Sequence, residues 1–203
     1  MIDLTDLENG QGPFGSRADG GYLIALHIRF TSPIVYVSTY PDEWQQHYTE
    51  RGYVLRDPMT AWAFANTGWT RWSNPDIPDP YGIMAESRAF GLRFGATISH
   101  GEVRSRSIVG AARRDRELTD AEIGAMASEL KRLHDLTNPE KQLTAAQTQA
   151  LSFVASGMRY AEAAGRLGIS ESALKLRLAG ARKRLLARTT AEAIQRAKDY
   201  RLI

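Results

Sequence analysis

The clearest hydrophobic pattern lies in the last part of the chain, from Leu143 to Ile203, where apolar residues recur at helical spacing between short turns. It predicts four helices, over residues 145–156, 160–167, about 171–187 and about 191–200. Gly157 and Gly168 follow the first two, in the position where glycine commonly ends a helix. This part of the chain is therefore expected to be a small four-helix domain.

The third of these helices combines an apolar stripe with a basic face. Its stripe consists of residues at intervals of four, three and four: Leu174, Leu178, Ala181 and Leu185. The same helix carries five basic residues: Lys175, Arg177, Arg182, Lys183 and Arg184. Ser170 is expected to cap it, directly after the tight turn that starts at Gly168. A short helix, a tight turn and a basic second helix form the helix-turn-helix that places a recognition helix in the major groove of DNA.

The front of the chain has a mixed pattern. Apolar, β-favouring runs predict strands at residues 22–29, 34–40, 94–99 and 107–112. Helical patterns predict helices at residues 42–51, 59–66, 85–90 and 119–135. A loop with three prolines takes up residues 69–80, and residues 137–142 form a linker. The order predicts an α/β/α sandwich around an antiparallel sheet. The whole chain is then α+β, with a sensor and dimerisation domain over residues 1–136 and a helix-turn-helix domain over residues 143–203.

Charge is distributed unevenly between these two parts. Residues 143–203 hold eleven Lys or Arg and four Asp or Glu, a net charge of +7. The remaining residues hold fifteen and nineteen, a net charge of −4. Neutralisation of phosphates drives the sequence-independent part of nucleic-acid binding, so a basic domain behind an acidic one favours a DNA-binding function.

Composition argues against several other classes of protein. The chain has no cysteine, which excludes disulfides and thiolate metal sites and suits the reducing cytoplasm. Its first residues lack the segments of a secretory signal, and no run approaches the ~20 apolar residues of a membrane span. The four histidines have no paired metal-ligand spacing, and neither a nucleophile elbow nor a glycine-rich phosphate loop is present. We therefore expect a cytoplasmic protein without a membrane partner, a metal, a cofactor or an enzymatic activity.

Aromatic residues cluster in the front domain around one acid. Tyr40, Trp44 and Tyr48 are four residues apart, which places them on one side of the predicted helix and its start. Further members follow closely: Tyr53, Asp57, Trp62, Trp69 and Trp72. Such a stripe commonly packs in a hydrophobic core. Hydroxyl groups, indole N–H groups and a carboxylate in an apolar wall would also suit a pocket for a small amphiphile, so both interpretations remain open.

The run RLGISESALKLRLAGARKRL and its flanks, from Leu143 to Ile203, resemble the LuxR-type helix-turn-helix along its whole length. The resemblance implies that three residues face base edges: Lys175, Leu176 and Ala179. It implies that three others lie near phosphates: Ser172, Arg182 and Lys183. Ala179 can contact a thymine methyl group but cannot donate a hydrogen bond, so base recognition at this position should be apolar or absent.

The tail also departs from that family at some positions. Leu186 stands where glycine is usual, Thr190 where arginine is usual, and Arg177 where histidine is common. The same helix is similar to the promoter-reading domain of a sigma factor, which would require a helical polymerase-binding domain at the front. A sigma-factor-like subunit of RNA polymerase is therefore the competing hypothesis from another class.

The front segment TYPDEWQQHYTERGYVLRDP resembles the autoinducer-binding domain of LuxR-type quorum-sensing receptors, and the later GLRFG is similar to another segment of it. This resemblance implies an N-acyl homoserine lactone as the ligand. Tyr40 and Trp44 would donate hydrogen bonds to its carbonyl groups, and Asp57 would accept one from its amide N–H. Tyr48 and Trp72 would form walls of the pocket. The chain is thereby expected to be a quorum-sensing transcription regulator.

The front also departs from its family. Trp69 stands where proline is common, and residues 110–113 offer no Ser or Thr hydroxyl. Only 43 residues precede Trp44, so an N-terminal helix that covers the sheet and supports a dimer is expected to be missing. A ligand-independent regulator or an antagonist is therefore an alternative to a lactone-controlled one. In the main hypothesis a homodimer binds a palindromic operator, with RNA polymerase as a further candidate partner.

Overall fold

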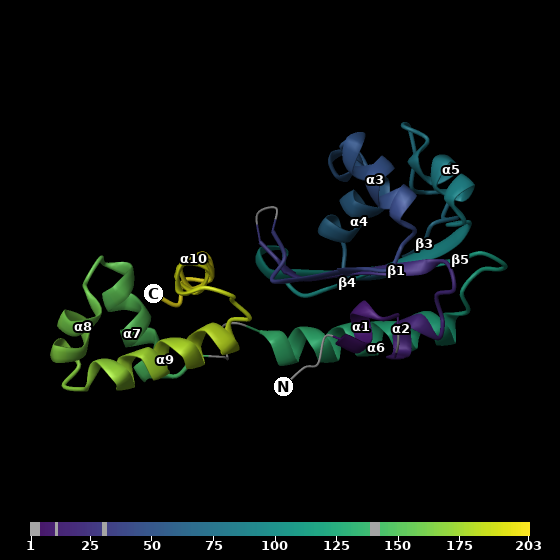
Figure 1. Ribbon diagram of the computed structural model, residues 1–203. Coiled ribbons are helices and arrows are strands. Elements are labelled where there is room, and N and C mark those ends of the chain that lie inside the picture. Colours follow the sequence, from purple (N-terminus) through teal and green to yellow (C-terminus); the bar gives the residue numbers. More distant parts are fainter. Residues whose placement is uncertain (1–4, 11, 30–31, 139–142) are drawn as a thin grey trace. The chain divides into compact units, whose positions relative to one another are not determined.

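The computed structural model describes residues 5–10, 12–29, 32–138 and 143–203. They belong to two compact units, residues 1–136 and residues 137–203 (Figure 1). Within the described ranges, no helix is both long enough and apolar enough to cross a lipid bilayer. Of the linker expected at residues 137–142, Thr137 belongs to a helix and residues 139–142 lie outside the described ranges.

An antiparallel sheet of five strands forms the centre of the N-terminal unit, in the order β2-β1-β5-β4-β3. Its strands are β1 (Gly21–Ile28), β2 (Val35–Ser38), β3 (Gly68–Arg71), β4 (Phe94–His100) and β5 (Arg106–Arg113). All except β3 match the predicted strands to within two residues at each end. The prediction of a loop from residue 69 is wrong for its first part, because Trp69 to Arg71 pair with β4. β3 has only four residues, too few for a recognisable pattern of alternating residues, and its strand conformation depends on pairing with the distant β4.

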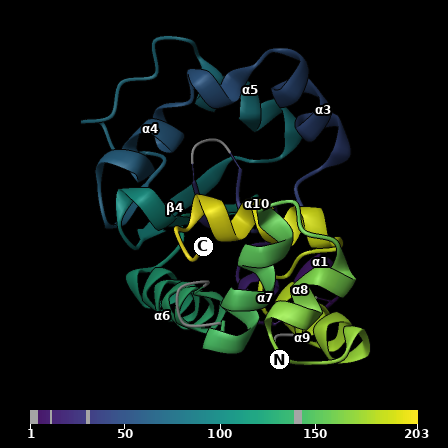
Figure 2. The same cartoon turned by 90° about the vertical axis from the view of Figure 1, so that its left-hand side faces the viewer.

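Helices cover both faces of this sheet (Figures 1 and 2). One face carries α3 (Asp42–Glu50), α4 (Pro58–Ala65) and α5 (Ile83–Ser87). The other carries α1 (Thr5–Glu8), α2 (Gly12–Gly15) and α6 (Asp120–Thr137). Short 3-10 turns complete the unit: η1 (Tyr53–Leu55), η2 (Arg88–Phe90) and η3 (Val103–Ser105). The arrangement confirms the predicted α/β/α sandwich.

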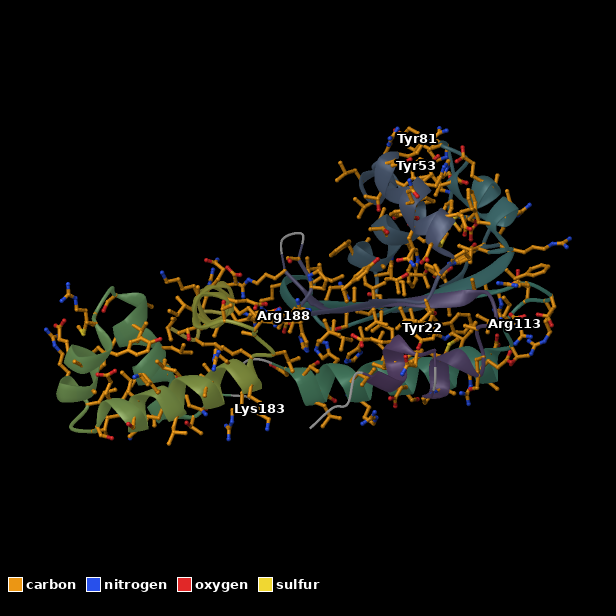
Figure 3. The ribbon with its side chains drawn as sticks, in the orientation of Figure 1. Tyr22, Tyr53, Tyr81, Arg113, Lys183 and Arg188 are labelled. Atoms are coloured by element: carbon orange, nitrogen blue, oxygen red, sulfur yellow. The ribbon has the colours of Figure 1, made fainter. Side chains whose placement is uncertain are left out.

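Alternate residues of β1 point to opposite faces of the sheet, as the two-residue period of a strand requires. Tyr22 points to the α6 face (Figure 3). Ile24 and Leu26 follow it at intervals of two on the same face, and all three are completely buried. The helix contributes residues three to four positions apart that are also completely buried: Ile123, Met126 and Leu130. Leu23 and Ala25 are left on the opposite face, toward α3, α4 and α5.

The short N-terminal segment packs on the same face of the sheet as α6, so the expectation that this cover is missing is wrong, while the expected loss of dimer support stays a prediction. Leu7 and Phe14, in α1 and α2, are buried, and the Tyr22 hydroxyl donates a hydrogen bond to the carbonyl of Leu7. Two helices of four residues each are too short to produce a helical period in the sequence. Tertiary packing against the sheet therefore determines them.

A bulge in β1 brings three histidines together. The β1–β5 register shifts there, and His27 has a left-handed backbone with a φ of 51°. Its buried ring donates from Nε2 to the carbonyl of His134, at 2.9 Å, and Nδ1 accepts from Ser105 Oγ, at 2.8 Å. The His134 ring stacks on it at 4.2 Å, and His100 packs edge-on against His134. Burial, together with the neighbouring His134, lowers the pKa of His27 to about 4.

Four helices form the C-terminal unit, as the hydrophobic period predicts: α7 (Ala145–Ala155), α8 (Tyr160–Arg166), α9 (Glu171–Arg184) and α10 (Thr190–Asp199). Side chains cap three of them. Thr144 and Gln147 form a reciprocal capping box on α7, Ser170 Oγ accepts from Ala173 N, and Thr189 caps α10. These caps satisfy backbone N–H groups that would otherwise lack partners at the helix starts.

The stripe of α9 is buried as predicted, since Leu174, Leu178, Ala181 and Leu185 all lie in one core with residues of the other helices. In α8 the sequence favours a face with Ala161, Ala164 and Leu167, but Ala161 is exposed and Ala163 is buried beside Ala164. A seven-residue helix contains only two turns, so its sequence cannot distinguish between two neighbouring faces. Packing against α9 decides between them.

Leu186, the second residue after the end of α9, has a left-handed backbone with a φ of 55°. Ala187 N donates to the Arg182 carbonyl and Leu186 N to the Lys183 carbonyl, which is the hydrogen-bond pattern of a Schellman helix end. A residue with a side chain is strained by about 1–2 kcal/mol in this left-handed conformation. Glycine avoids this strain, and the chain entropy that it loses on folding offsets only part of the gain. Leu186→Gly should therefore raise the free energy of unfolding of this unit by about 0.5–1 kcal/mol, measured by denaturation followed by far-UV circular dichroism.

Leu186→Ala is the control, because alanine keeps the Cβ atom that makes the conformation costly. It should give no stabilisation. If Leu186→Ala stabilised the unit as much as Leu186→Gly, the stabilisation would come from loss of the leucine side chain and not from relief of backbone strain.

Candidate ligand pocket and nucleic-acid interface

A cavity of about 160 Å³ lies between the sheet and the layer of α3, α4 and α5. Its floor consists of alternate strand residues: Leu23, Tyr36, Ser38, Thr97, Ile108 and Gly110. Four of these form one row across the sheet, since Leu23 pairs with Ser38 and Gly110, and Gly110 pairs with Thr97. The floor is therefore set by strand register.

All five residues that the family resemblance assigned to a ligand line this one cavity: Tyr40, Trp44, Tyr48, Asp57 and Trp72. Trp44 and Tyr48 lie one helical turn apart on α3, with ring centroids 5.7 Å from each other. Both also pack with Tyr53, Ile83, Leu92 and Phe90. The aromatic stripe thus forms part of a core and one wall of a pocket at the same time, so the two interpretations of the sequence are compatible.

Asp57 carries the most connected polar group in the cavity. As the N-cap of α4, its Oδ1 accepts from Met59 N at 2.8 Å and from Thr60 N at 3.4 Å. Its Oδ2 accepts from the Tyr48 hydroxyl at 2.8 Å and from Thr60 Oγ1 at 3.1 Å. A carboxylate has about four acceptor positions. A ligand N–H could therefore bind Asp57 only by replacing a mobile donor, and the Thr60 hydroxyl, which rotates freely, is the easiest to replace.

Two glycines make room for the large side chains of the pocket. A Cβ atom at Gly95 would lie 2.4 Å from Trp72 Cδ2, so the indole can lie on β4 only because this residue has no side chain. Trp72 Nε1 donates to Thr97 Oγ1 at 3.0 Å, which fixes the ring. A Cβ atom at Gly110 would lie 2.7 Å from the Tyr40 hydroxyl. The tyrosine hydroxyl thus occupies the floor where the sequence lacks a Ser or Thr.

Burial is the main cause that raises the pKa of the phenol groups of Tyr40 and Tyr48. The charge of Asp57 raises both pKa values further. Both hydroxyl groups therefore stay protonated at physiological pH. The Tyr40 hydroxyl can donate a hydrogen bond to a ligand carbonyl, whereas the Tyr48 hydroxyl already donates to Asp57.

The outer face of α9 forms the candidate nucleic-acid interface. The residues predicted to face base edges are accessible: Lys175 and Leu176 are exposed, and Ala179 is half-buried. Leu176, with 74% of its surface exposed, is an unusually accessible leucine. Of the residues predicted near phosphates, Ser172 is exposed and Arg182 is half-buried. Lys183 is also exposed (Figure 3). These positions lie three, four and seven residues apart, which places them opposite the buried stripe.

Two of these cations already have partners within the unit. Lys175 Nζ lies 2.8 Å from Glu171 Oε1, one helical turn earlier, and this pair raises the pKa of Lys175. Arg182 Nη1 donates to the Arg188 carbonyl at 3.4 Å. Both pairs are weak enough in water to be exchanged for a base or a phosphate.

Sequence reasoning did not identify several residues that shape the cavity. Thr60 lies beside Asp57 in the first turn of α4, and Thr97 lies beside Trp72 because strand β4 packs there. Ile83 and Leu92 line the wall from segments far along the chain. Leu92 and Gly95 both lie in GLRFG, a segment that carried a signal in the sequence. The contact of Gly95 with Trp72, however, follows only from the fold.

The family described as autoinducer binding domain matches residues 25–137, which is more than half of the chain. Two curated proteins are similar over most of the sequence. Transcriptional activator protein VanR of Vibrio anguillarum is 27% identical over 82% of this chain and 76% of its own length. Transcriptional activator protein RaiR of Rhizobium etli is 28% identical over 76% of this chain and 71% of its own length.

A solved structure is similar in fold. It is SdiA, a protein of Escherichia coli, in complex with octanoyl-rac-glycerol. The TM-score is 0.53 at 20% sequence identity, and the comparison covers 98% of this chain and 89% of that one. At this identity the likeness supports the fold alone.

Proposed function

Because this chain belongs to the autoinducer-binding family of LuxR-type quorum-sensing transcription regulators, we propose that an N-acyl homoserine lactone in its N-terminal cavity controls how its C-terminal unit binds DNA. The observation that carries this proposal is the convergence of Tyr40, Trp44, Tyr48, Asp57 and Trp72 on one cavity. A small amphiphile with two carbonyl groups and one amide N–H matches these donors and this acceptor.

The roles follow from the chemistry of each group. Tyr40 and Trp44 would donate to the ligand carbonyls, and Asp57 would accept from the amide N–H after the Thr60 hydroxyl has turned away. The Tyr48 hydroxyl would continue to donate to Asp57 Oδ2. Together with Trp72, Tyr48 would form the wall beside the lactone ring and the amide. An amide N–H left without an acceptor in such a site costs about 1–3 kcal/mol.

Ligand binding would act on DNA recognition through stability. A ligand that binds only the folded N-terminal unit stabilises it by mass action, and a homodimer joined through that unit would be stabilised with it. Two recognition helices would then reach the half-sites of a palindromic operator. RNA polymerase would be the further partner of a bound activator.

Thermal unfolding of the full chain with a panel of N-acyl homoserine lactones tests the ligand. At least one member should raise the unfolding midpoint of the N-terminal unit in a concentration-dependent way. A folded protein that binds operator DNA equally well without any of them, and shows no shift with any, would contradict ligand control. It would support the ligand-independent regulator, or an antagonist if operator binding by a second regulator falls.

Lys175→Ala tests the DNA-binding surface. We expect about tenfold weaker binding to the specific operator, near the lower end of the ~1–3 kcal/mol of a base contact, because Lys175 must first leave Glu171. Fluorescence anisotropy with specific and scrambled duplexes measures both affinities. Equal losses on the two duplexes would assign Lys175 to phosphates. Arg159→Ala is the control, since Arg159 is exposed and lies outside α9.

A sigma-factor-like function has less support. The N-terminal unit is built around an antiparallel sheet, whereas that function requires a helical domain at the front. The family match also falls on the sheet-containing unit. Both observations favour the LuxR-type regulator.

A further inference from the structure

We infer, on the basis of the proposed lactone site, that this pocket selects a short acyl chain, of about four to six carbons. The cavity measures about 160 Å³. Pockets for drug-sized ligands measure ~300–1,000 Å³, and a cavity of ~150 Å³ accommodates a molecule of the size of benzene. A homoserine lactone ring with its amide already reaches that size, so little enclosed volume is left for the chain.

The two ends of the cavity differ in chemistry, which fixes the direction of a bound ligand. At one end stand Trp44, Tyr48, Trp72 and their aromatic neighbours, with Asp57 beside them. At the other end Leu23 and Ile108 belong to an aliphatic cluster, and that end offers no charged group among the described lining residues. The polar lactone and amide fit the aromatic end, so the acyl chain points toward Ile108.

The aliphatic end of the cavity is closed by packed side chains. Behind Leu23 and Ile108, the same cluster contains the buried Ala25, Ile28 and Ala63, with Trp62 and Phe64 packed against it. Ser99 Oγ donates to the Ala63 carbonyl at 2.7 Å, which ties α4 to β4 at this point. A chain that grows toward Ile108 therefore meets a packed core, which resists added volume.

The lining has another outlet, at the edge of the sheet. Tyr36 of β2 and Thr49 of α3 are the exposed members of the cavity lining among the described residues. Carbons of a longer chain that left by this opening would stay in water and add little affinity. Each methylene that is buried should strengthen binding about fourfold, and each that is not should leave it unchanged.

Calorimetric titration of the full chain with unsubstituted butanoyl, hexanoyl, octanoyl and dodecanoyl homoserine lactone tests this inference. Affinity should rise from butanoyl to hexanoyl and then stay level or fall. Affinity that keeps rising about fourfold per methylene to dodecanoyl would overturn the inference and leave the proposed function standing. A folded protein that binds none of the four would overturn the proposed function and this inference together.

Ile108→Ala provides a second test, since it removes side-chain volume at the closed end. The preferred chain should become longer by about two carbons, with octanoyl binding at least fivefold more tightly than to the unchanged protein. Val109→Ala is the matched control: Val109 is completely buried on the same strand, but it lies outside the cavity lining and on the other face. An equal gain in both variants, or none in Ile108→Ala when it is folded, would overturn the inference.

Discussion

Acidification from pH 7 to pH 5 is expected to lower the free energy of unfolding of the N-terminal unit by about 2 kcal/mol through His27 alone. The folded unit holds the pKa of His27 at about 4, against 6.5 for the free side chain. Between these two pH values His27 binds a proton in the unfolded chain but not in the folded chain. The contribution of His27 to the free energy of unfolding is therefore nearly full above pH 6.5 and decreases as the pH falls. Below about pH 4 it does not decrease further.

The cause is the closed environment of the ring. His27 is completely buried between its hydrogen-bond partners Ser105 and His134, so water cannot solvate a charge on the ring. A charge on His134 or His100 would disfavour a charge on His27, whereas Asp135 and the hydrogen bond to the His134 carbonyl favour one. The pKa of His100 is also lowered, mainly by burial, which adds to the same acid sensitivity.

Urea denaturation followed by tryptophan fluorescence measures this effect on the N-terminal unit. All four tryptophans lie between residues 44 and 72, and all four histidines lie in the same unit. The C-terminal unit contains no histidine, so its transition, followed by circular dichroism, should be nearly constant over this pH range. It serves as an internal control.

His27→Asn separates the histidine from other titrating groups, because asparagine tolerates a positive φ but does not titrate. The variant should be less stable at pH 7, since it loses the bond to the His134 carbonyl. Its stability should nevertheless change by about 2 kcal/mol less between pH 7 and pH 5. A pH dependence identical to that of the unchanged protein would show that His27 is not the sensitive group.

Asp57→Asn is expected to weaken lactone binding by roughly 10- to 100-fold, which corresponds to about 1–3 kcal/mol. Asparagine can still cap α4 through its carbonyl oxygen, and it is as good a capping residue as aspartate. Its NH₂ group, however, would replace Oδ2, which now accepts from Tyr48 and Thr60. The ligand amide N–H would then face a donor. Titration with the lactone that binds best measures the loss.

Asp79→Asn is the matched control for this prediction. Asp79 also caps a helix, since its carboxylate accepts from the backbone N–H groups of Ile83 and Met84 at 3.0 and 2.8 Å. It lies outside the cavity lining. Its replacement should leave lactone affinity within about twofold of the unchanged protein. Equal losses in the two variants would mean that a general change in helix capping, rather than an acceptor at Asp57, controls binding.

Some residues of the candidate site could be predicted from the sequence, and others could not. Tyr40, Trp44 and Tyr48 could be selected because their four-residue spacing and their family resemblance coincide. Thr97 and Ile108 could not, because nothing in their own segments relates them to those residues. Contact between them depends on strand pairing across the sheet, which is a non-local property.

The sequence by itself determined the C-terminal unit almost completely. The stripe from Leu174 to Leu185, the cap at Ser170 and the exposed Lys175 all follow from contacts within a few residues, which local sequence encodes. It also determined four of the five strands, whose apolar runs are long enough to show a pattern.

Only the tertiary structure decided the edge strand β3, the burial of His27 and the volume of the cavity. Each depends on partners far along the chain: β4 for β3, His134 of α6 for His27, and Ile108 of β5 for the closed end of the pocket. A hydrophobic period identifies which face of an element is buried. The amount of space left between two such faces is set by side-chain packing, which emerges only when the elements are assembled.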